Sequence, residues 1–165
     1  MMKKICMLGA SAVGKTSLVK RFVEGIFSER YLTTVGVKID KKSVRVGERS
    51  LDLVLWDLNG EDRFQKLSMS YVRGAAGYLL VVDGTRRETL DTAMVLHHKV
   101  RAVLGETPFV MVFNKADLEE EWVFSDEDLR MQAARGWTVL KTSAKTGTGV
   151  DEVFMQLSAR LLELE

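Results

Sequence analysis

Cysteine and histidine are scarce in this chain of 165 residues, which contains one cysteine and two histidines. A single cysteine cannot form an internal disulfide, so the sequence suits a reducing compartment and we expect a cytoplasmic protein. Cys6 lies within an apolar run, where we interpret it as a buried small hydrophobic side chain. His97 and His98 are adjacent in a predicted helix and point about 100° apart, which argues against joint binding of a metal ion.

An excess of charge of one sign and long apolar runs are also missing. The 24 Lys and Arg residues nearly balance the 23 Asp and Glu residues, so the overall charge gives no reason to expect nucleic acid as a partner. There is no run of about 18 apolar residues to span a membrane. The chain has no C-terminal cysteine for prenylation, and Met1-Met2 excludes N-myristoylation. We therefore expect no direct membrane anchor, and a monomer of one domain over residues 1–165.

Residues 9–16 read GASAVGKT and join an apolar run to a helical pattern. They fit the phosphate-binding signature G-x-x-x-x-G-K-[ST], which should occur by chance in roughly one chain of this length in a few hundred. The glycines allow backbone N–H groups to approach phosphate oxygens closely, Lys15 supplies an ammonium, and the Thr16 hydroxyl can bind Mg²⁺. The segment predicts a site for phosphate and Mg²⁺ at the start of a helix.

Apolar runs alternate with helical patterns along the rest of the chain. Residues 47–50 separate two of the runs and predict an antiparallel hairpin. Residues 64–73 are weakly helical. Strands are predicted at 3–8, 37–46, 51–56, 78–82, 109–113 and 137–140, and helices at 15–23, 89–104, about ten residues after Ser125 up to Gly136, and 150–164. This order predicts an α/β fold, a doubly wound six-stranded mostly parallel sheet with one antiparallel edge strand.

Four loops with informative residues each follow a predicted strand, at 9–16, 57–60, 114–117 and 143–145. In a doubly wound sheet, ligands bind beyond the carboxyl ends of the strands. These loops should therefore share one ligand site on a single edge of the sheet.

The residues of the second and third loops extend the chemistry of that site. Asp57 can hold Mg²⁺ through water, and Gly60 leaves a backbone N–H able to reach a terminal phosphate. In Asn114-Lys115-x-Asp117 the carboxylate can accept two hydrogen bonds from the N1–H and amino group of guanine, an arrangement that mismatches adenine. The alkyl stem of Lys115 can cover a base face, and Asn114 can tie this loop to the phosphate loop. The motif predicts a guanine nucleotide as ligand.

With Thr142-Ser143-Ala144-Lys145 as a fifth motif, the chain resembles the small GTPases of the Ras superfamily over essentially its whole length. It is most similar to the Rab branch, notably in segments 27–31, 34–37, 71–75 and 83–89. The resemblance implies a P-loop NTPase with a Ras-like G domain that hydrolyses GTP to GDP and acts as a molecular switch. It also implies Mg²⁺ as cofactor, and effector, exchange-factor and GTPase-activator partners that bind through segments 27–39 and 57–73.

The resemblance also assigns individual roles. Thr34 would bind Mg²⁺ when a γ-phosphate is present, Phe27 would pack edge-on against guanine, and Tyr31 would close over the phosphates. The Ala144 N–H would contact the guanine O6. The implied nucleotide-binding residues are Ser11, Ala12, Val13, Gly14, Lys15, Thr16, Ser17, Phe27, Tyr31, Thr34, Gly60, Asn114, Lys115, Asp117, Ser143, Ala144 and Lys145. The implied metal ligands are Thr16, Thr34 and Asp57, and the implied catalytic residues are Lys15, Gly60 and Glu61.

Glu61 departs from the family pattern, which has glutamine there. Glutamine can accept a hydrogen bond from the attacking water and donate one to the γ-phosphate, whereas an ionised glutamate only accepts and adds a like charge. We predict slow hydrolysis without a partner. Three alternatives remain open: Glu61 orients water adequately, it points to solvent, or the chain is a GTP-dependent binding module with negligible hydrolysis.

Other departures concern partners. Ser11 and Ala12 stand where Ras proteins carry glycine, and they crowd the path of an arginine supplied by an activator. Ile39, Trp56 and Tyr71 fall where Rab proteins place an effector-binding aromatic trio, with Ile39 replacing phenylalanine.

A P-loop phosphotransferase acting on a small substrate is a further alternative, and a comparison of GDP with ADP binding would separate it from a GTPase.

Overall fold

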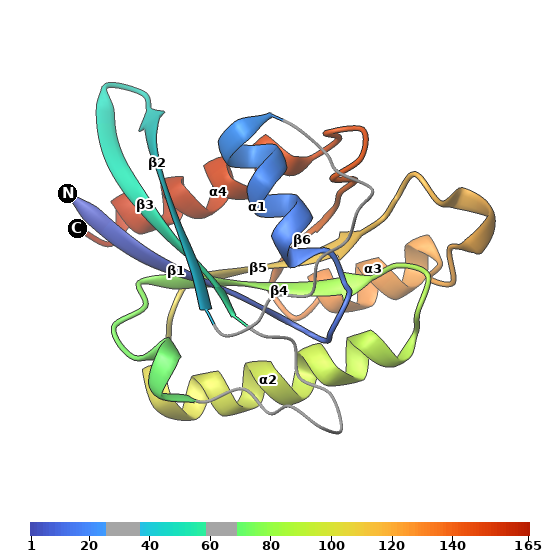
Figure 1. Ribbon diagram of the computed structural model, residues 1–165. Coiled ribbons are helices and arrows are strands. Elements are labelled where there is room, and N and C mark those ends of the chain that lie inside the picture. The colour runs from blue at the N-terminus through green and yellow to red at the C-terminus, as the bar shows by residue number, and fades with distance from the viewer. Residues whose placement is uncertain (26–36, 59–68) are drawn as a thin grey trace.

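The computed structural model describes residues 1–25, 37–58 and 69–165 (Figure 1). Within them, six strands form one sheet in the order β2-β3-β1-β4-β5-β6. The strands β2 and β3 pair antiparallel, and all other neighbours pair parallel. The strands are β1 (Met2–Gly9), β2 (Val37–Val46), β3 (Arg49–Leu58), β4 (Gly77–Asp83), β5 (Phe109–Asn114) and β6 (Thr138–Lys141). The predicted mostly parallel sheet with an antiparallel edge strand is confirmed.

Helices cover both faces of the sheet, with α1 and α4 on one side and α2 on the other (Figure 1). The helices are α1 (Lys15–Glu24), α2 (Glu88–Leu104), α3 (Asp126–Ala133) and α4 (Val150–Glu163), and two 3₁₀ turns are η1 (Met69–Val72) and η2 (Glu119–Glu121). None of these helices is long and apolar enough to cross a membrane, in the part of the chain that the structure describes.

The two faces of the sheet carry separate hydrophobic cores. In β4, Leu79 and Val81 join the core under α1 and α4, whereas Leu80 and Val82 join the core under α2. Every residue of β4 and β5 is buried, as expected for parallel strands covered on both faces. This burial explains why these strands read as unbroken apolar runs rather than alternating ones.

Three segments differ from the sequence prediction. Strand β3 is longer than predicted, because its pairing with β2 continues from Val37 opposite Leu58 to Val46 opposite Arg49, which reduces the connection to a two-residue turn. Helix α3 has the predicted capping box at Ser125 but ends at Ala133 rather than near Gly136, since the chain leaves the helix through a tight turn. Of the weak helix predicted at 64–73, residues 69–72 form a 3₁₀ turn and residues 64–68 lie outside the described part.

The two adjacent histidines of α2 lie in different environments. His97 is 9% exposed, and its Nδ1 lies 3.0 Å from the hydroxyl of Tyr78. Phe109 and Trp137 also pack against the His97 ring. His98 is exposed on the neighbouring side of α2.

Candidate functional site

The predicted loops meet at the carboxyl ends of the parallel strands. The loop after β1 runs into α1, Asp57 lies near the end of β3, Asn114 ends β5, and Ser143 follows β6. Because these strands run parallel, their carboxyl ends share one edge of the sheet. Hydrogen bonds between segments as much as 101 residues apart join these loops into one cluster.

The phosphate loop depends on two glycines. A Cβ on Gly9 would lie 2.5 Å from the carbonyl oxygen of Val81 in β4. Gly14 has φ 103°, and a Cβ there would lie 2.3 Å from Nδ2 of Asn114. At the N-cap of α1, Gly14 also brings no side-chain acceptor to the first N–H groups of the helix. An anion can accept hydrogen bonds from these N–H groups at the positive end of the helix dipole.

Lys15 places its ammonium in the same loop. The side chain is buried, and Nζ lies 3.0 Å from the carbonyl oxygens of both Gly9 and Ala10. Burial lowers the pKa of Lys15 from 10.5 to about 8, and the charge of Asp57 opposes part of this shift. A buried cation gains strongly from an adjacent anion, so this ammonium is well suited to a phosphate.

Two oxygen ligands for a metal ion lie beside the loop. The Thr16 hydroxyl donates to Oδ2 of Asp57 over 2.5 Å, and Asp57 is almost fully buried. A hydroxyl and a carboxylate are hard oxygen donors, and Mg²⁺ typically binds one or two protein oxygens together with substrate phosphates. The pair therefore fits Mg²⁺. Thr34, the third predicted ligand, lies outside the described residues.

Asn114 connects the phosphate loop to the last predicted motif. Its Nδ2 donates to the carbonyl of Val13 over 3.1 Å, and its Oδ1 accepts from the Thr142 hydroxyl over 2.9 Å. The side chain is buried, so losing either partner would leave a polar group unpaired. The predicted tie between the Asn114 loop and the phosphate loop is present.

Lys115 makes a second connection to the phosphate loop. Its Nζ donates to the carbonyl of Ala12 over 2.9 Å and pairs with Asp83 over 2.7 Å. Burial of Asp83 favours its neutral form, but hydrogen bonds from Lys115 and Thr85 outweigh burial and hold the Asp83 pKa below its ordinary value. Lys115 is therefore held by a buried carboxylate beneath the loop.

Asp117 and Ser143 meet at the edge of the cluster. The Ser143 hydroxyl donates to Oδ1 of Asp117 over 2.7 Å and accepts from the Thr146 N–H over 3.1 Å. This contact holds the proposed guanine-reading carboxylate against the last loop. Ala144 is buried and Lys145 exposed in that loop, and Ser17 follows Thr16 in the first turn of α1.

Three residues of the cluster were not predicted from the sequence. Arg86 donates to the carbonyl of Ser11 over 3.0 Å and lies 3.6 Å from Asp83. Arg21 donates to the carbonyl of Ala144 over 2.8 Å. A carboxylate closing a fully apolar strand was a signal for Asp83, whereas nothing in the sequence distinguishes Arg21 or Arg86 from surface arginines.

Five predicted residues, Phe27, Tyr31, Thr34, Gly60 and Glu61, lie outside the described part of the chain.

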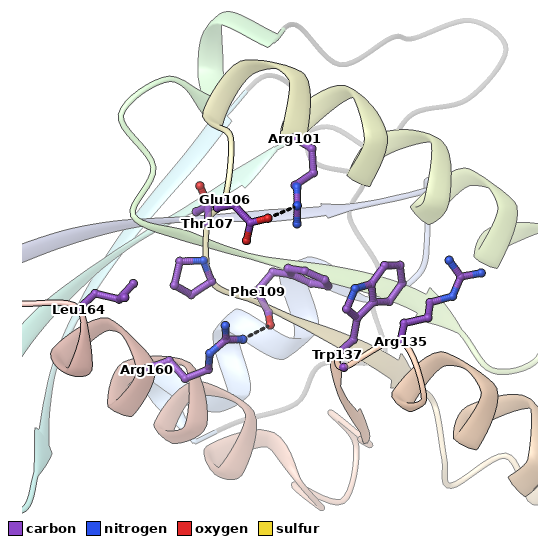
Figure 2. Close-up of a pocket in the computed structure, with 10 residues that line it drawn as sticks. Arg101, Glu106, Thr107, Phe109, Arg135, Trp137, Arg160 and Leu164 are labelled. Carbon is purple, nitrogen blue, oxygen red and sulfur yellow. Dashed lines mark hydrogen bonds and ion pairs between the residues drawn. The ribbon is translucent and has the colours of Figure 1, made fainter.

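A pocket of about 390 Å³ lies at the opposite end of the sheet, near the start of β5 (Figure 2). It is lined by Arg101, Glu106, Thr107, Pro108, Phe109, Arg135, Gly136, Trp137, Arg160 and Leu164, none of which belongs to the predicted site.

Comparison with known proteins agrees with this arrangement. Residues 4–163 match the Ras family. The chain is 36% identical to the Ras-related protein RABA6a of Arabidopsis thaliana, over 98% of this chain and 70% of that protein. It is 33% identical to the Ras-related protein SEC4 of Saccharomyces cerevisiae, over 97% and 75%, and 34% identical to the Ras-related protein Rab-21 of Homo sapiens, over 97% and 72%. The chain is therefore a Rab-like member of the Ras family, a family of small GTPases that switch between GTP-bound and GDP-bound states.

Proposed function

We propose that this chain binds GTP and GDP with Mg²⁺ at the carboxyl edge of its sheet, as one G domain, and hydrolyses GTP slowly unless a partner assists. The observation that supports this most directly is the buried contact of Asn114 with both Val13 and Thr142. That contact joins the phosphate loop to the loops that carry the two predicted guanine motifs, which supports a single site for the nucleotide.

In this proposal the phosphates lie against the N–H groups of residues 12–17 and the ammonium of Lys15. Thr16 and Asp57, with Thr34, hold Mg²⁺, which when bound neutralises charge on the phosphate oxygens. Asp117 accepts hydrogen bonds from the guanine edge, and the Ala144 N–H donates to the guanine O6. Base selectivity comes from Asp117, because its acceptor pattern matches guanine and mismatches adenine.

Glu61 sets the rate in this proposal. An ionised carboxylate can orient an attacking water but cannot donate to the γ-phosphate, and its charge opposes the negative phosphoryl oxygens. An activator that contributes an arginine can supply roughly 10³- to 10⁵-fold in rate. The protein would then remain in its GTP-bound form until such a partner arrives.

Single-turnover hydrolysis of preloaded GTP tests this proposal. We expect the wild-type rate to be slow and Glu61→Gln to be faster. Equal rates for the two proteins would contradict the role of Glu61. A complete absence of phosphate release from the wild type under multiple-turnover conditions would favour the binding module instead. GDP binding no tighter than ADP binding would contradict the nucleotide assignment itself.

We further propose that partners bind through segments 27–39 and 57–73, with the start of β2 as part of the surface. Ile39 is 52% exposed and lies directly across from Trp56 on β3. Tyr71, in the 3₁₀ turn η1 that follows β3 along the chain, is 42% exposed. The ammonium of Lys4 lies 3.7 Å from the centre of the Trp56 ring. Exposed aromatic and aliphatic side chains of this kind are typical anchors of protein interfaces.

A further inference from the structure

Arg21 lies in the last turn of α1 and directs its guanidinium at backbone carbonyl groups. Its Nε donates to the carbonyl of Ala144 over 2.8 Å, and its Nη2 donates to the carbonyl of Lys145. Its Nη1 donates to the carbonyl of Gly25 over 3.3 Å, at the end of its own helix. One side chain therefore joins the end of α1 to a loop more than 120 residues further along the chain.

The loop that Arg21 contacts is otherwise held mainly by its own hydrogen bonds. The Ser143 N–H donates to the carbonyl of Thr148 over 2.9 Å, and the Gly147 N–H donates to the carbonyl of Ser143 over 2.8 Å. The second of these bonds is accepted by the Ser143 carbonyl, which belongs to the same peptide group as the Ala144 N–H, and it therefore orients that peptide group. Arg21 holds the next peptide group through the Ala144 carbonyl. Together they fix the backbone on both sides of Ala144.

We propose that Arg21 is a positioning residue for base recognition, which aims the Ala144 N–H at the oxygen on C6 of the purine. This inference rests on the proposed function, in which the Ala144 loop meets the guanine base. Arg21 does not touch the nucleotide in this proposal. It contributes to selectivity for a 6-oxo purine through the backbone that it holds.

The chemistry of the side chain supports this role. A guanidinium is planar and presents its N–H donors in a fixed fork, so Nε and Nη2 can hold two successive carbonyl groups at once. A lysine ammonium has no such fork and cannot reproduce that geometry. The contact should therefore be sensitive to Arg21→Lys as well as to Arg21→Ala.

The test compares three nucleoside diphosphates that differ at the purine edge. GDP has O6, the N1 proton and the 2-amino group. Inosine diphosphate keeps O6 and the N1 proton. 2-Aminopurine riboside diphosphate lacks both and keeps the 2-amino group. Dissociation constants would be measured with Mg²⁺ for the wild type, Arg21→Ala and Arg21→Lys. Arg45→Ala is the matched control, because Arg45 is exposed on β2 and its side chain bonds to the nearby carbonyl of Gly47.

We expect Arg21→Ala to weaken the binding of GDP and of inosine diphosphate by about tenfold each, which is the effect of losing one well-placed hydrogen bond. The affinity for the 2-aminopurine compound should change less than about twofold, because this compound has no O6 and so makes no hydrogen bond with the Ala144 N–H that the substitution could weaken. Arg21→Lys should show the same pattern, and Arg45→Ala should leave all three affinities unchanged.

An equal loss for all three ligands, or no loss for GDP, would overturn the role of Arg21. If Arg21→Ala does not fold, the pattern in Arg21→Lys decides, because that variant keeps the charge and the alkyl stem. A wild-type protein that does not distinguish GDP from the 2-aminopurine compound or from ADP would instead contradict the proposed function. The two failures are therefore distinguishable.

Discussion

Replacing Gly14 by alanine is expected to break the connection between the phosphate loop and Asn114. A Cβ at position 14 would lie 2.3 Å from Nδ2 of Asn114, closer than any real Cβ contact. The same amide donates to the carbonyl of Val13 over 3.1 Å. Because the side chain of Asn114 is buried and bonded to Thr142 on its other side, it cannot move away without losing at least one hydrogen bond.

Two contributions set the size of the effect. Backbone strain from a non-glycine residue at φ 103° costs about 1–3 kcal/mol. Loss of a hydrogen bond from a buried polar group costs about 1–3 kcal/mol more. We therefore expect Gly14→Ala to destabilise the folded, nucleotide-bound protein by about 2–6 kcal/mol relative to the unfolded chain and free nucleotide.

A double-mutant cycle separates the two contributions. In an Asn114→Ala background the amide is gone, so adding Gly14→Ala should cost only the backbone strain. The coupling between the two positions should then be about 1–3 kcal/mol. The measurements are the dissociation constant for GDP and the free energy of unfolding, at fixed GDP and Mg²⁺ concentrations for all four proteins, so that the stabilisation by bound nucleotide can be subtracted.

The outcome that refutes the reasoning is additivity. If the two substitutions add within about 0.5 kcal/mol, the Cβ at position 14 does not displace the amide, and the contact between Asn114 and Val13 does not depend on the glycine. A Gly14→Ala protein with unchanged GDP affinity would contradict the steric argument entirely.

Two further predictions concern the metal and the buried histidine. Thr16→Val removes the hydroxyl beside Asp57 and should lower Mg²⁺ affinity by roughly tenfold or more. EDTA should therefore accelerate GDP release from this variant much less than from the wild type. Thr92→Val on α2 is the control, and a Thr16→Val protein with the wild-type response to EDTA would contradict the assignment. Burial, with the charges of Arg101, His98 and Arg135, holds the His97 pKa below its ordinary value. The unfolded chain therefore takes up a proton first as pH falls below about 6.5, which destabilises the fold. The midpoint temperature of unfolding should fall more steeply from pH 7 to pH 5 for the wild type than for His97→Gln. The slope for His98→Gln should lie between the two, because the His98 charge is one of the causes that lower the His97 pKa. Equal slopes for the wild type and His97→Gln would show that His97 has no part in the pH response.

The sequence by itself determined the elements and the order of the chemical motifs, because both depend on local physics. Unbroken apolar runs mark strands buried on both faces, as in β4. A serine followed three residues later by an acidic residue marks the start of a helix, as at Ser125. Glycines at fixed spacing before Lys15 mark a phosphate-binding loop. Since the motif loops follow parallel strands, even their shared location was predictable.

Apart from the predicted contact of Asn114 with the phosphate loop, only the tertiary structure decided how those loops are held together. Arg21 reaches Ala144 and Lys145, Arg86 reaches Ser11, and Lys115 binds both Ala12 and Asp83. These contacts join residues 32 to 124 positions apart, and exposed arginines and lysines look alike in a sequence whatever they touch. Their partners are mostly backbone carbonyl groups, which every residue has. Only the folded geometry can therefore distinguish the arginine that binds the last loop from one that is solvated at the surface.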